Sequence, residues 1–142
     1  MGMNLINDIL KRGGNIERLL GTVEPYEKGR IDTIKNRISN NLNEILPATV
    51  IDQNRFEQEL IYYLEKIDIT EEKVRLTQHC AYFRQTVEQG QMPGRKLGFI
   101  AQEMGREINT LGSKGNEANM QQIVVHMKDE LEKIKEQLLN IL

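Results

Sequence analysis

The fold class of this chain can be read from residues 95–111, RKLGFIAQEMGREINTL. Five apolar residues in this stretch recur at alternating spacings of four and three, which places their side chains on one face of an α-helix. They are Leu97, Ala101, Met104, Ile108 and Leu111. Gly112 follows, at the position where a glycine commonly ends a helix. The pattern predicts a helix from Arg95 to Leu111 with one buried stripe.

Helical patterns continue on both sides of this stretch. Thr70, followed by Glu71 and Glu72, is typical of a capped helix N-terminus. The helix that it starts is expected to bury Leu76, Cys80, Phe83 and Val87. The segment from Gly90 to Gly94 interrupts the pattern. A last helix is expected from about Glu117, and its heptad stripe indicates packing along another helix. This stripe consists of Met127, Leu131, Ile134, Leu138 and Ile141.

The N-terminal half predicts three further helices. The first carries Ile9, Leu10, Ile16, Leu19 and Leu20 at helical spacing, with Gly13 and Gly14 weakening its centre. The second carries Ile31, Ile34, Ile38, Leu42 and Ile45 on a narrow face, and the third carries Phe56, Leu60, Leu64 and Ile67, widened by Ile61 and Tyr63. We expect Thr22 to cap the second helix, Pro47 to end it, and Asp52 to cap the third. The wide face of the third helix should be buried.

No hairpin signal and no sustained period of two is present, so an appreciable sheet is not expected. The sequence therefore predicts an all-α protein: a helical bundle with a long antiparallel helical hairpin or coiled-coil-like arm. We expect residues 1–142 to form a single domain.

Composition limits the classes of function. The formal net charge of −2 excludes a global cationic field, so any contact with RNA would need a local basic patch. The single cysteine, Cys80, cannot form an internal disulfide and is expected to be a small core residue in a reducing cytoplasm. No apolar run is long enough to cross a bilayer, and no phosphate-binding P-loop spacing occurs.

Two carboxylates lie on the predicted helix from Arg95 to Leu111. Glu103 and Glu107 are four residues apart and so project from the same side. Such a pair is tolerated best with a cation between the two groups, and oxygen ligands suit Mg²⁺ or Mn²⁺. The alternative is a pair of solvated surface glutamates, which spacing alone favours.

A histidine lies on the neighbouring predicted helix. His79 falls beside the apolar stripe, in line with Glu72, Arg75 and Tyr82. It could ligate a metal or act as general base on a ribose 2′-hydroxyl, because an ordinary histidine exchanges protons near neutral pH. The alternative is a half-buried histidine hydrogen-bonded to Glu72 or to another helix, which the residues alone favour.

Residues 70–115 also contain a local excess of cationic side chains. The basic members are Lys73, Arg75, Arg84, Arg95, Lys96, Arg106 and Lys114. If the nearby glutamates hold a metal ion, these side chains could bind phosphates. The alternative is an ordinary solvated surface, which composition alone favours.

The features described above lie in stretches that resemble a known family. These are residues 63–76, YLEKIDITEEKVRL, His79 with Phe83, residues 94–114, GRKLGFIAQEMGREINTLGSK, and the closing VVHMKDELEKIKEQ. Together they resemble the C-terminal domain of the YicC-like endoribonucleases, over essentially the whole chain.

The resemblance implies an activity and a set of site residues. It implies a metal-dependent endoribonuclease that cleaves single-stranded RNA and forms a homo-oligomer, a hexamer in full-length members, with no membrane association. It assigns catalysis to His79, Glu103 and Glu107. It assigns Mg²⁺ or Mn²⁺ binding to Glu103, Glu107, His79 and Glu72, and RNA binding to Arg75, Arg95, Lys96, Arg106 and Lys114.

The sequence departs from the family in two respects. Many members carry an acidic residue at the position of Gly98. Members also have an additional N-terminal domain, so we expect this chain to be part of a longer protein and to fold without necessarily cleaving RNA by itself. The alternative function is a non-catalytic helical module for oligomerisation or RNA binding.

Overall fold

A computed structural model describes residues 2–45, 53–90 and 94–141, and within these ranges the chain is helical and contains no strand. The helices are α1 (Gly2–Gly21), α2 (Glu24–Ile45), α3 (Gln53–Ile67), α4 (Thr70–Glu88), α5 (Gly94–Lys114) and α6 (Ala118–Ile141). The predicted all-α class is therefore confirmed. None of the described helices is both long and apolar enough to span a membrane.

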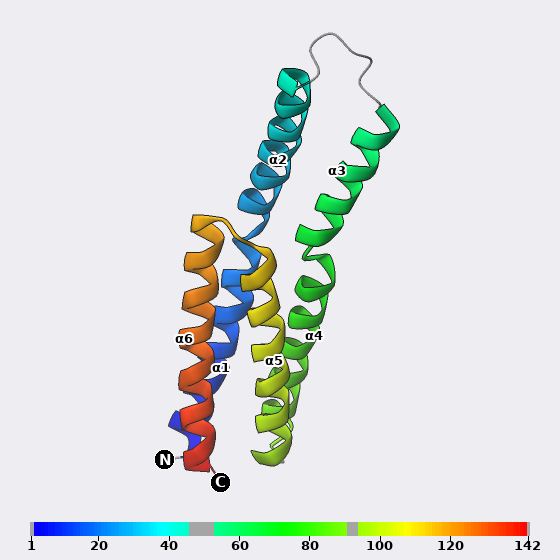
Figure 1. Ribbon diagram of the computed structural model, residues 1–142. Coiled ribbons are helices and arrows are strands. Elements are labelled where there is room, and N and C mark those ends of the chain that lie inside the picture. The colour runs from blue at the N-terminus through cyan, green and yellow to red at the C-terminus, as the bar shows by residue number, and fades with distance from the viewer. Residues whose placement is uncertain (1, 46–52, 91–93, 142) are drawn as a thin grey trace.

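Four helices, α1, α4, α5 and α6, lie side by side as a bundle (Figure 1). Its core contains the stripes predicted for these helices, including Leu97 to Leu111 on α5 and Met127 to Leu138 on α6. Cys80 is buried in this core, as expected. Gly13 lies inside α1, opposite Phe83, where an added Cβ would be 3.8 Å from the ring. The glycines of α1 therefore do not interrupt the helix.

The other two helices, α2 and α3, extend beyond the bundle as an antiparallel arm (Figure 1). Ile31, Ile34 and Ile38 are half-buried along α2, as the narrow stripe predicted. The expected burial of the wide face of α3 is wrong in part, because Ile61 and Tyr63 are 54% and 46% exposed. Among the described helices, α2 is the main neighbour of α3, and its sparse contact leaves much of the α3 surface uncovered. The side chains of Leu42, Ile45 and Ile141, and residues Pro47 and Asp52, lie outside the described part.

Three predicted helix boundaries are wrong for local reasons. The Thr22 hydroxyl donates to the carbonyl of Leu19 at the end of α1, instead of capping α2. Thr70 is the first residue of α4, and Asp68 accepts from both its N–H and its hydroxyl. Gly112 lies inside α5, which continues to Lys114. A Cβ at Gly112 would be 3.1 Å from Cγ1 of Val124 on α6. Gly112 thus permits close packing of two helices.

Candidate functional site: the face between α4 and α5

The first turn of α4 lies against the last turn of α5. Glu72 is buried, with 4% of its side chain exposed, and its Oε1 lies 2.7 Å from Nζ of Lys114. The same ammonium group donates to the carbonyl of Asp68 at 3.2 Å. The other carboxylate oxygen of Glu72, Oε2, is buried and has no hydrogen-bond partner among the described residues. A buried carboxylate oxygen without a partner is uncommon in proteins, and it sets Glu72 apart from the solvated glutamates of α4.

Asp68 carries a second negative charge at this end of the face. Hydrogen bonds from the Thr70 hydroxyl and the Thr70 N–H lower the pKa of Asp68 below its ordinary value. Lys114 and Lys73 lower this pKa further by electrostatic attraction. Asp68 therefore stays ionised, and it closes the α3–α4 turn beside Lys114.

Glu107 lies further along the same face. Its side chain is 7% exposed, and its Oε1 is 3.9 Å from Nη1 of Arg75 on α4. Arg75 also contacts Glu71 at 3.1 Å. The interpretation of Glu107 as a solvated surface glutamate is therefore wrong. Because Arg75 follows Glu72 by one turn of α4, both buried carboxylates lie along one strip between the two helices.

Glu103 has a different environment. It is 28% exposed and 3.9 Å from Arg106, which is 75% exposed. Both side chains line a shallow cleft of about 470 Å³ that also includes Lys135 of α6. The structure thus places Glu107 against α4, and it places Glu103 and Arg106 at a cleft shared with α6.

His79 and Lys96 lie towards the other end of the face. His79 is half-buried on α4, one turn after Arg75, and makes no hydrogen bond or ion pair within the described residues. Its expected hydrogen bond to Glu72 is absent from the described contacts. Lys96 of α5 lies over the ring of Tyr82 of α4, with its Nζ 5.0 Å from the ring centroid. This cation–π contact joins the two helices.

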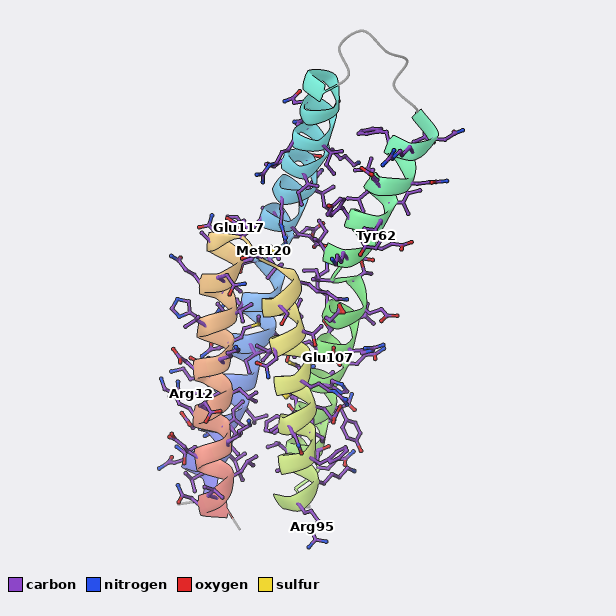
Figure 2. The ribbon with its side chains drawn as sticks, viewed as in Figure 1. Arg12, Tyr62, Arg95, Glu107, Glu117 and Met120 are labelled. Carbon is purple, nitrogen blue, oxygen red and sulfur yellow. The ribbon has the colours of Figure 1, made fainter. Side chains whose placement is uncertain are left out.

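Arg95 is separate from the buried carboxylates. It projects from the first turn of α5, whereas Glu107 lies near the middle of the bundle (Figure 2). Twelve residues separate the two on one helix, which corresponds to about 18 Å along its axis. The five predicted RNA-binding side chains therefore do not converge on one phosphate.

The predicted metal ligands do not form a preassembled cluster. Across residues 2–45, 53–90 and 94–141, no group of three or more His, Cys, Asp or Glu side chains is arranged to hold a metal ion. Glu72, His79, Glu103 and Glu107 are all described, so they do not form a complete four-ligand site within this chain.

Two further contacts join the arm to this site, and neither was predicted. Arg30 of α2 donates through Nη1 to the carbonyl of Lys114. Lys73 of α4 lies 2.6 Å from Glu27 of α2. Together they fix the base of the arm against the face between α4 and α5. Spacing within one helix gives no signal for such contacts, since the partners are distant in sequence.

Sequence comparisons agree with this architecture. Residues 23–142 match the family described as "Endoribonuclease YicC-like, C-terminal". A protein of Clostridioides difficile named "Probable endoribonuclease YicC" is 37% identical over 141 residues, which is 99% of this chain and 48% of the relative. A protein of the same name from Haemophilus influenzae is 38% identical over 91 residues, which is 64% of this chain and 32% of the relative. The chain thus spans about half the length of the first relative and a third of the second. It belongs to the YicC-like C-terminal endoribonuclease family.

Proposed function

We propose that this chain supplies the RNA-cleaving face of an endoribonuclease that acts on single-stranded RNA. The observation that carries the proposal is the burial of Glu72 and Glu107 between α4 and α5, each beside a cation. Burial of a charged group costs free energy of folding. Two buried carboxylates at one helix interface are therefore typical of a binding or catalytic site. The names of the relatives support the reaction class.

His79 is the proposed proton-exchanging group. It lies one turn from Arg75 and is free of other described partners, so an imidazole nitrogen is available to a ribose 2′-hydroxyl or to water. Glu107 holds Arg75 in place, and Arg75 binds the scissile phosphate. Glu103 acts from the adjoining cleft, where it orients Arg106.

The remaining cations would bind further phosphates of the strand. Arg95 and Lys96 lie at one end of α5, and Lys114 lies at the other. They span nineteen residues, or about 28 Å of helix, so they would contact several nucleotides of an extended strand. This arrangement favours single-stranded RNA over a compact ligand.

A divalent ion, Mg²⁺ or Mn²⁺, is part of the proposal. The described residues offer no three-ligand cluster, but Mg²⁺ in nucleic-acid enzymes commonly takes one or two carboxylates, several waters and substrate phosphates. Glu107 and Glu72 are the carboxylates on this face that would serve, and Glu72 would have to turn its buried Oε2 towards the ion. When bound, such an ion would polarise the phosphate.

Self-association through the arm is a second proposal. Ile61, Tyr62 and Tyr63 of α3 are 54%, 58% and 46% exposed, and Tyr62 projects outward in Figure 2. A homo-oligomer would cover these side chains.

A cytoplasmic location is also part of the proposal. The free thiol of Cys80 fits an enzyme of the cytoplasm.

Cleavage of labelled RNA tests the proposed function. Wild-type protein, in its longest natural form, should cut a single-stranded oligonucleotide with Mn²⁺ or Mg²⁺ present and should leave a duplex of the same sequence largely intact. Binding of the ion to the folded state should also raise the melting temperature. RNA binding without product would identify a binding module, and indifference to both RNA and metal would favour an assembly module.

A further inference from the structure

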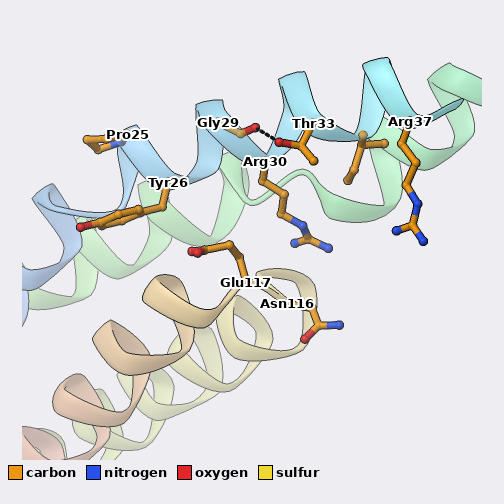
Figure 3. Close-up of a pocket in the computed structure, with 9 residues that line it drawn as sticks. Pro25, Tyr26, Gly29, Arg30, Thr33, Arg37, Asn116 and Glu117 are labelled. Carbon is orange, nitrogen blue, oxygen red and sulfur yellow. Dashed lines mark hydrogen bonds between the residues drawn. The ribbon is translucent and has the colours of Figure 1, made fainter. Parts of the chain in front are cut away.

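A cleft at the base of the arm lies outside the face described above. It is formed between α2 and the turn that joins α5 to α6 (Figure 3), and has a volume of about 540 Å³. Its walls include Tyr26, Gly29, Arg30 and Arg37 from α2 and Asn116 from the turn. Their spacing places the α2 residues on one side of that helix. A volume of this size can hold a nucleotide.

The charge of the cleft favours an anion. Arg37 is exposed and has no ion pair among the described residues. Arg30 uses Nη1 for the Lys114 carbonyl, which leaves other guanidinium N–H groups for a ligand. Glu117, the one carboxylate among the described residues of the wall, accepts from the Met120 N–H at 2.9 Å and from the side-chain amide of Asn119 at 3.0 Å. Hydrogen bonds from the backbone N–H groups of Asn119 and Met120 lower the pKa of Glu117, and Arg30 contributes by attraction. Glu117 therefore stays ionised and offsets one of the two arginines, which leaves the described wall with a net positive charge.

The wall also offers a surface for a base. Tyr26 is 39% exposed and lies one turn before Arg30. Nucleic-acid bases stack on such aromatic rings, and arginine side chains beside the ring bind the phosphates. Arg30 and Arg37 are two turns apart, or about 10 Å along the helix, so they can contact different phosphates of one strand.

The cleft adjoins the candidate site through one residue. Lys114 accepts from Arg30 at its carbonyl and contacts Glu72 with its ammonium group. We propose that the cleft is a subsite for single-stranded RNA, in which Tyr26 stacks on a base and Arg30 and Arg37 bind phosphates of the strand that leaves the face between α4 and α5. This inference rests on the proposed function.

Gly29 provides the test. A Cβ added at Gly29 would meet nothing within 4 Å, so a larger side chain can occupy the cleft without a clash in the fold. Gly29→Leu should therefore weaken binding of a fluorescent oligouridylate by about tenfold or more, the loss expected when stacking of one base is prevented. Gly29→Ala is the matched control and should bind as the wild type does. Both variants should melt no earlier than the wild type, because each replaces a helical glycine.

Two further variants separate stacking from charge. Tyr26→Ala should lose affinity by about tenfold, and Tyr26→Phe should retain it. Arg37→Gln should lower the slope of log affinity against log salt by about 0.7, the value for one phosphate of a single strand. Equal affinity of Gly29→Leu and wild type would overturn the subsite while leaving the proposed function intact, provided that the wild type still cleaves RNA.

Two other results would overturn the inference. Failure of the wild type to bind oligouridylate would reject the subsite together with the proposed function. A change in sedimentation with Gly29→Leu, at unchanged RNA affinity, would show that the cleft is a contact between protein chains.

Discussion

The ammonium group of Lys114 lies 2.7 Å from Oε1 of Glu72, at the point where the end of α5 meets the start of α4. The position suits both charges, since a carboxylate is favoured near a helix N-terminus and an ammonium group near a C-terminus. Lys114 also accepts from Arg30 of α2. This residue therefore connects the bundle, the arm and the candidate site.

Removing the ammonium group should destabilise the fold. Lys114→Met would leave the buried carboxylate of Glu72 without its partner. We expect the free energy of unfolding to fall by about 3 kcal/mol, the lower end of the range for a broken buried pair, because Lys114 is partly exposed. Urea denaturation measures the change. Lys135→Met, which removes an exposed ion pair with Glu132, should cost less than about 0.5 kcal/mol. Equal effects of the two variants would contradict the importance of the buried pair.

Glycines in different packing environments should respond in opposite ways to alanine. A Cβ at Gly115 would lie 2.8 Å from the Leu111 carbonyl and 2.6 Å from Cε of Met120, so Gly115→Ala should destabilise the fold by about 1 to 3 kcal/mol. A Cβ at Gly14 in α1 would meet nothing within 4 Å, and Gly14→Ala should stabilise by about 0.5 to 1 kcal/mol. Thermal unfolding of both variants tests the described packing of the α5–α6 turn. An unchanged melting temperature for Gly115→Ala would contradict that packing.

Burial of Cys80 should make stability depend on pH in the alkaline range. Burial raises the pKa of the thiol from 9.0 to about 12. Because the unfolded chain releases this proton first, the stabilising contribution is complete below pH 9 and is lost as the pH rises towards 12. Unfolding measured between pH 8 and 11 should show a decline that is smaller in Cys80→Ala. Rapid alkylation of the native thiol at pH 8 would contradict its burial.

Most of the bundle could be predicted from sequence because its helices bury regular apolar stripes. Leu97 to Leu111 and Met127 to Leu138 lie in the core where their spacing placed them. The end of α5 could not be predicted in this way. Gly112 is the residue type that commonly ends a helix, but here it lets Val124 of α6 pack closely against α5. The spacing of residues within α5 carries no information about that neighbour.

Less of the candidate site could be predicted from the sequence, because its contacts also depend on neighbouring helices. Glu103 and Glu107 share a helix and a spacing, yet Glu107 is buried against Arg75 while Glu103 lies at a cleft shared with α6. The rotation of α5 relative to its neighbours determines this difference. Arg30 was missed because its partner is a backbone carbonyl of another helix.

Cleavage by a Glu107→Gln variant is the most direct test of the central claim, that the face between α4 and α5 carries the RNA-cleaving site. The change removes one charge and preserves shape, and Glu132→Gln on the exposed side of α6 is the matched control. With both variants folded, as judged by thermal unfolding, Glu107→Gln should cut single-stranded RNA about ten- to a hundredfold more slowly than the wild type, because Arg75 and the ion lose the charge that holds them. Glu132→Gln should cut at the wild-type rate. Wild-type cleavage by Glu107→Gln would contradict the claim.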